Sequence, residues 1–246
     1  MTESIAYPAG AIKHLRVADP VLGDLITRYG IVTRERDRPP FYALMAAIVG
    51  QQISVKAAAA IMGRLLGLFA EGQAVQAAAL VDVSFEQLRA VGLSTAKARY
   101  LHDLAEKVAD GTIDLAALTQ LPDEEVIAIL CQVKGIGRWT AEMFLIFSLG
   151  RLDVLAVDDL GLRSGIQRAY RLDQLPRAAE IRALAVPWQP YRTIATLYFW
   201  QHLPYAWLSG ALCRCCQKYS VAIVRYGCQG TASARISAAR GSWSSR

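Results

Sequence analysis

Residues 130–147 read LCQVKGIGRWTAEMFLIF, which marks the end of one helix, a tight turn and the start of a second helix. Glycines at positions 135 and 137 let the backbone turn sharply. They also leave backbone N–H groups uncovered beside a helix N-terminus, where unpaired donors and the helix dipole attract an anion. The stretch therefore predicts a helix-turn-helix unit, over about residues 122–150, that can hold a phosphate group.

The side chains of this turn suit contact with nucleic acid. Ile136 can pack the two helices together, and Lys134, Arg138 and the Thr140 hydroxyl can each contact a backbone phosphate. Such contacts fix the position of a protein on a duplex without reading its sequence. A plain connection between helices, whose glycines only satisfy the geometry of the turn, is the alternative that this stretch alone leaves open.

A second informative stretch, VLAVDDLGLRSGI at residues 154–166, places two carboxylates at the start of a helix. We expect Asp158 to cap that helix, which leaves Asp159 over. If Asp159 faces a pocket between helices, its carboxylate can stabilise a developing positive charge or orient a water molecule. An aspartate that only complements the dipole of the first helical turn is the alternative.

The rest of the chain predicts an all-α fold. No proline occurs between Pro40 and Pro122, and the alternation typical of strands is scarce there. With 246 residues, 54% hydrophobic and 20% charged, the chain forms one large or two small domains and is not a disordered polyelectrolyte. We expect helices over about residues 20–29, 41–52, 55–69, 95–110, 122–133, 138–149, 159–170, 176–186 and 190–202. Asp19, Ser54 and Ser94 are expected to cap the starts of the helices that follow them.

The net charge of +6 comes wholly from the C-terminal segment. Residues 209–246 hold six basic and no acidic residues, whereas residues 1–208 hold 21 of each sign. We therefore expect a folded part, 1–208, and a flexible basic tail, 209–246. No apolar run approaches the roughly 20 residues of a membrane span, and the N-terminus lacks an export signal, so we expect a cytoplasmic protein.

The cysteines and histidines predict no metal site. Four of the five cysteines lie in the tail with the spacing C-x-C-C-x11-C, and Cys131 stands alone in an apolar segment. This spacing matches neither a disulfide framework nor a zinc site made of paired C-x-x-C motifs. Because the three histidines are scattered as well, we expect neither a metal ion nor another cofactor.

Together, these stretches resemble a known signature. VKGIGRWTA at residues 133–141, followed by VDD at 157–159, is similar to the helix-hairpin-helix and Gly/Pro-Asp signature of the DNA glycosylase superfamily that includes endonuclease III. IVGQQISVKAA at 48–58 and PWQPYRTIATLYFW at 187–200 resemble its alkylbase branch, the 3-methyladenine DNA glycosylase II family. The resemblance spans roughly residues 15–208 and implies two helical subdomains with the active site in the cleft between them.

The resemblance implies roles for single residues of these motifs. Asp159 matches the catalytic aspartate of the family. Gly135, Ile136 and Gly137 match the hairpin that binds a DNA phosphate. Gln52 stands where a wedge side chain fills the gap left by an extruded nucleotide, although long bacterial members carry an apolar residue there.

The resemblance also implies a pocket for the extruded base. Trp139 and Tyr191 match aromatic positions of that pocket, and Met143 replaces an aromatic residue that some relatives have. Trp188 and Gln51 are further candidates for the pocket wall. Their alternatives are packing in the core for Trp188 and packing of the adjacent turn for Gln51.

The implied reaction is the excision of an alkylated purine, such as 3-methyladenine or 7-methylguanine, from double-stranded DNA at the nucleoid. Trp139 stands where bifunctional members carry the lysine that forms a Schiff base, so the resemblance implies a monofunctional enzyme that leaves an abasic site. The tail cysteines do not match the C-x6-C-x2-C-x5-C spacing of the iron–sulfur branch, so no cluster is expected. We also expect a monomer.

A site with a single carboxylate suits the implied reaction. An alkylated purine carries a positive charge, which weakens its glycosidic bond, so one carboxylate can do what ordinary glycosidases assign to two. Trp139 and Tyr191 can favour such a cationic base by cation–π contact. Two other functions stay open from the sequence. The chain can be a glycosylase for uracil or oxidised bases, or a DNA-binding protein without enzymatic activity.

Overall fold

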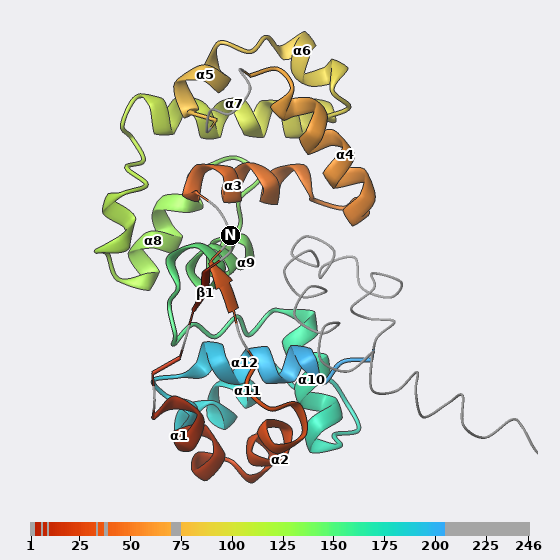
Figure 1. The fold of residues 1–246 in the computed structure, drawn as a ribbon, viewed down its shortest axis with the longest axis vertical. Coiled ribbons are helices and arrows are strands. Elements are labelled where there is room, and N and C mark those ends of the chain that lie inside the picture. Colours follow the sequence, from red (N-terminus) through yellow and green to blue (C-terminus); the bar gives the residue numbers. More distant parts are fainter. Residues whose placement is uncertain are drawn as a thin grey trace, which may run out of the picture.

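The computed structural model describes residues 3–5, 7–8, 10–32, 34–36, 39–69 and 75–204 (Figure 1). Their regular structure is almost entirely helical, so the predicted all-α fold is confirmed. One addition is a two-stranded antiparallel ribbon, in which β1 (Glu3–Ile5) pairs with β2 (Arg34–Arg36). The predicted flexible tail, 209–246, and its boundary at residue 208 lie outside the described residues.

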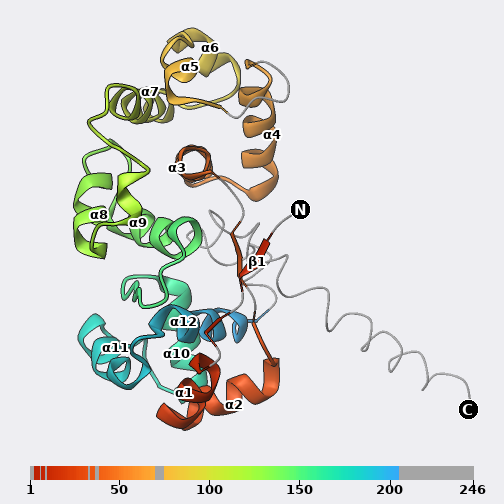
Figure 2. The same ribbon diagram turned by 60° about the vertical axis from the view of Figure 1, so that its left-hand side comes forward.

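Two hydrophobic cores divide the described helices into two lobes, which Figures 1 and 2 show one above the other. The large lobe contains α3 (Pro40–Val49), α4 (Val55–Leu66), α5 (Ala77–Val81), α6 (Phe85–Ala90), α7 (Thr95–Ala109), η1 (Ala117–Thr119), α8 (Asp123–Leu130), α9 (Arg138–Phe144) and η2 (Leu145–Leu149). The small lobe contains α1 (Ala11–Ala18), α2 (Pro20–Tyr29), α10 (Leu160–Tyr170), α11 (Ala178–Leu184), η3 (Val186–Trp188) and α12 (Arg192–Gln201). N-terminal and C-terminal helices thus share one lobe.

Helix α12 lies between the two cores. Residues 193–200 are all buried; Trp200 belongs to the core of the large lobe, whereas Phe199 belongs to the core of the small lobe. A helix that is buried on all sides is apolar all round, which explains the composition of this stretch. Helix α10 crosses α12 at Gly165, where an added Cβ would lie 2.5 Å from the Phe199 carbonyl oxygen.

The helix starts predicted from capping residues are confirmed. Asp19, Ser54 and Ser94 each accept a hydrogen bond from a backbone N–H group in the first turn of α2, α4 and α7. Such caps satisfy donors that have no partner within the helix. The helix expected over 138–149 differs, because α9 ends at Phe144 and continues as the π-helical η2. Short π-helical turns are frequent at functional sites.

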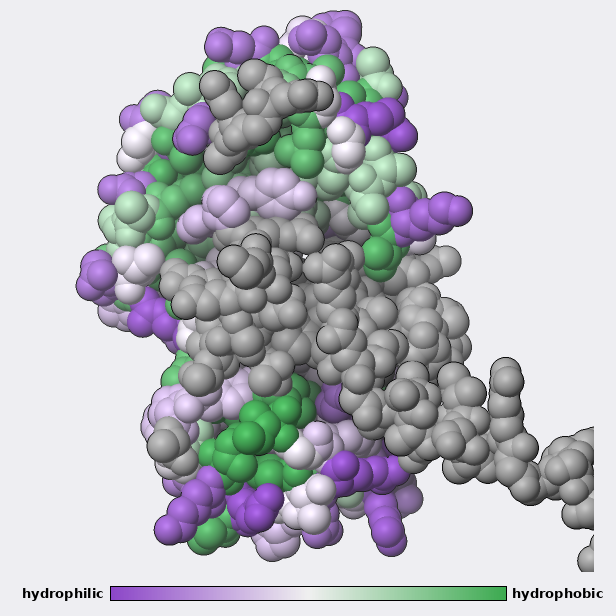
Figure 3. All heavy atoms as spheres, viewed as in Figure 1, coloured by the Kyte–Doolittle hydropathy of each residue, from purple (hydrophilic) through white to green (hydrophobic). Residues whose placement is uncertain are grey.

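Hydrophilic side chains cover the outer ends of both lobes in Figure 3. The residues excluded from water form the two cores and the junction between the lobes. Among the helices of the described residues, none combines the length and the apolar character that crossing a membrane requires.

Candidate active site

Three hydrogen-bond donors hold the Asp159 carboxylate at the N-terminus of α10. Its Oδ1 atom accepts from the Leu162 backbone N–H at 2.6 Å and from the Trp200 indole N–H at 2.7 Å. Its Oδ2 atom accepts from the Trp139 indole N–H at 2.9 Å. Because Asp159 is only 2% exposed, these bonds fix a carboxylate that bulk water barely reaches.

The structure gives the capping role at the start of α10 to Asp159 and not to Asp158. Asp159 is the N-cap of α10, since its own side chain accepts the bond from the Leu162 backbone N–H. Asp158 is exposed. The prediction that Asp158 caps this helix is therefore wrong, and one buried carboxylate both caps the helix and binds the two indoles.

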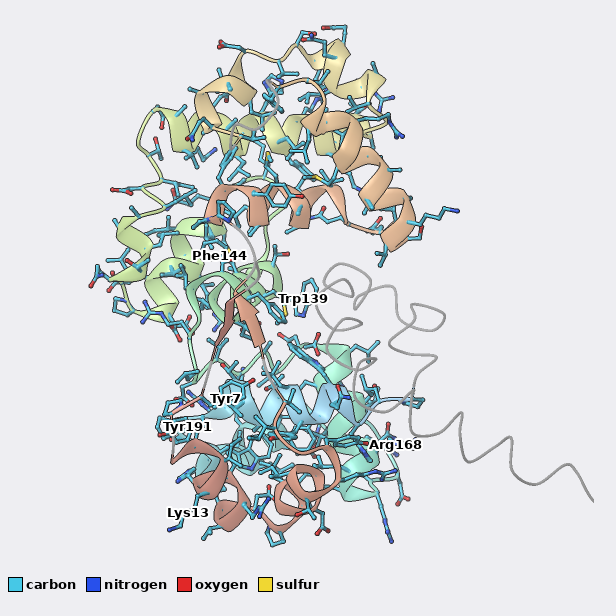
Figure 4. The ribbon with its side chains drawn as sticks, viewed as in Figure 1. Tyr7, Lys13, Trp139, Phe144, Arg168 and Tyr191 are labelled. Carbon is cyan, nitrogen blue, oxygen red and sulfur yellow. The ribbon has the colours of Figure 1, made fainter. Side chains whose placement is uncertain are left out.

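Helices that are distant in the sequence bring these groups together. Trp139 stands in the first turn of α9, directly after the glycines, and Trp200 stands in the last turn of α12 (Figure 4). The Trp200 ring stacks on Phe147 of η2, with centroids 5.9 Å apart and planes 13° apart. The Asp159 carboxylate thus lies where the two lobes meet, and the π-helical turn supports one of its two indole donors.

Burial raises the pKa of Asp159 above its ordinary value, since a charged carboxylate loses its hydration there. The Trp200 indole, the Leu162 backbone N–H and the Trp139 indole oppose this effect, because they stabilise the ionised form. The result is a desolvated carboxylate surrounded by fixed dipoles. Such a preorganised group stabilises a positive charge that develops in a transition state more strongly than a solvated group does.

The glycine turn, residues 131–137, has the geometry that its sequence predicts. Gly135 has a φ of +82°, and a Cβ there would lie 2.2 Å from the Tyr100 ring, so only glycine satisfies both the backbone and the packing. Ile136 is buried. Gly137 is the N-cap of α9, no side chain caps this helix, and a Cβ added at Gly137 would meet nothing within 4 Å. The first N–H groups of α9 are therefore available to an anion.

Arg138 differs from the expectation that it is free to bind a phosphate. It donates to Glu124 at 2.5 and 2.9 Å and to Glu142 at 3.1 Å. These carboxylates raise the pKa of Arg138, and burial raises the pKa of Glu142 to about 7. Because Arg138 is paired twice, a phosphate at this position has to compete with Glu124 and Glu142.

The other two polar residues of the turn behave differently from each other. Lys134 is exposed, with its Nζ atom 3.5 Å from Asp103 Oδ1, so it can still reach a phosphate. Thr140 is only 4% exposed. The predicted phosphate contact of the Thr140 hydroxyl is therefore not available in this conformation, because the first turn of α9 packs this side chain inside.

The turn between α3 and α4 lies against the glycine turn. Gln51 Nε2 donates to the Gly135 carbonyl oxygen at 2.7 Å. Gln51 therefore packs the adjacent turn, which is the alternative to its role in the pocket wall. Gln52 is exposed and has a φ of +57°. A side chain in this left-handed region costs about 1–3 kcal/mol, which the surrounding turn has to offset. The wedge role of Gln52 stays a prediction.

Two aromatic residues expected in the base pocket lie elsewhere. Tyr191 is the N-cap of α12, nine residues before Trp200 and so about 14 Å away along the helix. Figure 4 shows Tyr191 at the left edge of the small lobe, whereas Trp139 lies near the middle of the molecule, between the lobes. Trp188 is fully buried in the small lobe, where its indole donates to Asp19 at 2.8 Å. The length of α12 separates Tyr191 from Asp159, and Trp188 takes its alternative role as a core residue.

Trp200 is the main residue that sequence reasoning missed. It is the last residue of the stretch 187–200, and its burial beside Asp159 follows from the packing of α12 between two cores. A usable signal existed, because a buried indole N–H needs a hydrogen-bond partner. Met143 is only 1% exposed in the core of the large lobe. The structure therefore does not present Met143 as a wall of an open pocket.

Metal ligation is not indicated by the described part of the chain. There, no three side chains of the types that bind metals come together, and Cys131 is exposed and forms no disulfide. The other cysteines, Cys213, Cys215, Cys216 and Cys228, lie outside the described residues. The expected absence of a metal ion or cofactor stays a prediction.

Comparison with known proteins identifies similar sequences. Residues 45–190 match the model of the HhH-GPD superfamily base excision DNA repair protein. DNA-3-methyladenine glycosylase 1 of Schizosaccharomyces pombe is 38% identical over 165 residues, which cover 67% of this chain and 72% of the relative. The alkylbase DNA glycosidase-like protein mag2 of the same yeast is 30% identical over 195 residues, which cover 78% of this chain and 92% of the relative.

Solved structures show the same architecture. A 3-methyladenine DNA glycosylase of Schizosaccharomyces pombe in complex with abasic DNA superposes with a TM-score of 0.68 at 35% identity, over 78% of this chain and 96% of that one. A DNA-3-methyladenine glycosidase of Bacillus halodurans superposes with a TM-score of 0.74 at 35% identity, over 89% of this chain and 98% of that one. Both lobes therefore belong to one shared fold.

Proposed function

Because this chain belongs to the HhH-GPD superfamily of base excision DNA repair proteins, we propose that it is a monofunctional DNA glycosylase for alkylated purines. Relatives and solved structures named for 3-methyladenine support the substrate class. The observation that carries the proposal is the buried Asp159 carboxylate, held by two indoles and a helix N-terminus where the lobes meet.

The chemistry of an alkylated purine matches a site with a single carboxylate. Alkylation at N3 of adenine or N7 of guanine gives the base a positive charge, so the base needs little acid assistance to leave. As the bond from C1′ to the base nitrogen breaks, its electron pair neutralises the base and the sugar becomes an oxocarbenium ion. The Asp159 carboxylate opposes that charge and helps place the water whose oxygen bonds to C1′.

The indoles beside Asp159 supply the affinity for a cationic base. Trp139 is partly buried, and its N–H binds the same carboxylate that faces the sugar. An aromatic face attracts a desolvated cation by about 0.5–2 kcal/mol. We therefore assign the base contact to Trp139, with Trp200 behind the carboxylate, and no longer to Tyr191.

The glycine turn and the α3–α4 turn are the proposed DNA-binding elements. The uncapped N-terminus of α9 at Gly137 can receive a backbone phosphate, and the exposed Gln52 can enter the gap left by the extruded nucleotide. Extrusion costs a few kcal/mol and costs least at a damaged pair, which adds selectivity before chemistry starts.

The composition of the site supports two further parts of the proposal. The Asp159 carboxylate accepts hydrogen bonds from two indoles and a backbone N–H, and Trp139 offers no amine for a Schiff base, which supports a monofunctional reaction. All of these groups come from one chain, which supports action as a monomer. The substrate is chromosomal DNA, so we place the enzyme at the nucleoid.

Free bases released from modified duplexes test this function. Wild-type protein should release 3-methyladenine and 7-methylguanine from methylated DNA, and Asp159→Asn should reduce the rate by about 10²–10³-fold or more while duplex binding persists. Release of uracil or oxidised purines alone, from deaminated or oxidised DNA, would assign a different substrate class. Binding without any release by the wild type would leave a DNA-binding protein without glycosylase activity.

A further inference from the structure

The small lobe carries a group of basic residues that the proposed active site does not use. Arg28 lies in the last turn of α2, Arg168 lies in the last turn of α10, and His202 is the C-cap of α12. The Tyr29 hydroxyl lies 2.9 Å from His202 Nδ1, and Arg28 Cζ lies 5.6 Å from the centre of the Tyr29 ring. These four residues are called the basic cluster below.

Helix packing brings the parts of the basic cluster together. Helix α10 crosses α12 at Gly165 and Phe199, and Arg168 and His202 each follow this crossing by three residues. Burial lowers the pKa of His202, and the charges of Arg168 and then Arg28 lower it further. A carboxylate beside His202 would act in the opposite direction, so positive charge prevails around this side chain.

Neither arginine of the basic cluster is neutralised within the described part of the chain. Both are exposed, and no hydrogen bond or salt bridge joins Arg28 or Arg168 to a described residue. Arg138, which is exposed, and Arg192, which is partly buried, differ because both are bound to carboxylates. Cations in a last helical turn complement the helix dipole, which is the purely structural explanation of the basic cluster.

The position of the basic cluster relative to Asp159 favours a second explanation. Nine residues of α10 separate Asp159 from Arg168, which is about 14 Å along the helix. One strand of a duplex carries a phosphate about every 3.4 Å along its axis. Figure 4 shows Arg168 on the side of the small lobe away from Tyr191 and Lys13. A duplex with its damaged nucleotide at Asp159 therefore has phosphates within reach of Arg168.

We propose that the basic cluster is a second phosphate-binding site for duplex DNA, a few nucleotides from the extruded base. The two guanidinium groups donate to phosphate oxygens, and the paired Tyr29 and His202 side chains hold the surface between them. This proposal rests on the proposed function and deepens it. With the glycine turn on the large lobe, each lobe then holds the DNA backbone on its own side of Asp159.

The salt dependence of DNA affinity tests this site directly. We would measure binding of a duplex with a tetrahydrofuran abasic analogue at several potassium chloride concentrations, for wild-type protein and for Arg28→Gln/Arg168→Gln. Each lost phosphate contact should lower the slope of log affinity against log salt by about 0.9. When the salt is raised from about 50 to about 200 mM, the fold-loss of affinity should therefore be about tenfold smaller in Arg28→Gln/Arg168→Gln than in the wild type.

Matched variants separate phosphate binding from other effects. Lys13→Gln/Arg182→Gln removes two exposed charges elsewhere on the small lobe and should keep the wild-type slope. Arg28→Lys/Arg168→Lys keeps the charges and should retain most of the slope. A wild-type slope in Arg28→Gln/Arg168→Gln overturns the proposal. If the melting temperature is also lower in that variant, the arginines only stabilise the ends of their helices. Base release is assayed separately, so a wild type that binds DNA without releasing base would refute the proposed function alone.

Discussion

Asp19 in the small lobe and Asp159 at the junction of the lobes have nearly the same local chemistry. Both aspartates are buried, both cap a helix, and both accept hydrogen bonds from two aromatic side chains. For Asp19 these donors are the Tyr170 hydroxyl and the Trp188 indole. A capped and buried aspartate with aromatic donors is therefore not sufficient to identify an active site.

The difference lies in where the aromatic donors are held. Trp188 is completely buried in the core of the small lobe, and Tyr170, which is partly buried, packs against the same core, so both donors of Asp19 belong to one lobe. The donors of Asp159 come from α9 and α12, and Trp139 is only partly buried. The same hydrogen-bonding pattern thus lies within one lobe at Asp19 and joins helices of both lobes at Asp159.

Exchange of each aspartate for asparagine gives the largest expected contrast. Asp159→Asn should abolish most base release, whereas Asp19→Asn should reduce the free energy of unfolding by about 2–4 kcal/mol, because charge-assisted bonds in a buried network are lost. Single-turnover excision and urea unfolding measure the two effects. Comparable loss of excision in a folded Asp19→Asn protein would remove the distinction between the two sites.

Removal of one indole donor from each aspartate should give a smaller contrast. Trp200→Phe should lower excision by about tenfold, because a bond to an ionised group contributes about 1.5 kcal/mol. That bond lowers the pKa of Asp159, so its loss should move the acid limb of the pH–rate profile to higher pH. Trp188→Phe should lower the melting temperature and leave the profile in place; a shifted profile there would contradict the comparison.

The pH dependence of stability should report the burial of Asp159. Because the folded pKa of Asp159 is raised, its contribution to stability is complete below the ordinary value of 3.8 and is lost as pH rises through the folded pKa. Asp159→Asn should therefore gain stability relative to the wild type as pH rises from the ordinary value of 3.8 through the raised folded pKa of Asp159. Chemical denaturation at several pH values measures this, and a relative loss of stability would show that the folded pKa is lowered instead.

The weakest expected effect concerns the support of Trp200. Phe147→Leu removes the stacked ring, so the Trp200 indole should bind Asp159 less firmly. Excision should fall by about three- to fivefold, which corresponds to an aromatic contact of roughly 0.7–1 kcal/mol. Phe147→Tyr keeps the ring and should restore the rate. Equal rates in both variants, with an unchanged acid limb, would mean that the π-helical turn does not position the indole.

Short-range signals made much of this site predictable from the sequence. Gly135 and Gly137 indicated a turn, and at Gly135 the positive φ requires glycine. Ser54 and Ser94 indicated helix starts because their hydroxyls satisfy free N–H groups. The short helices α1, α5 and α6 escaped notice, since segments of five to eight residues are helical only when they are packed.

Errors arose where a role depended on partners distant in the chain. The assignment of the cap to Asp158 was wrong because the choice between adjacent aspartates depends on how α10 docks. Tyr191 was placed in the pocket because its motif was considered without the length of α12. The ion pair of Arg138 with Glu124 across the glycine turn also depends on tertiary packing, and the phosphate contact of Arg138 stays a prediction.

The sequence by itself determined an all-α chain, the glycine turn and an aspartate at the start of α10, because these depend on the conformation of neighbouring residues. Only the tertiary structure decided that Asp159 is the buried cap, that Trp200 is its second indole partner, and that Arg28 and Arg168 share one surface. Hydrogen bonds and charge clusters of this kind join residues far apart in the chain. These interactions form only once the two cores have packed α12 between them.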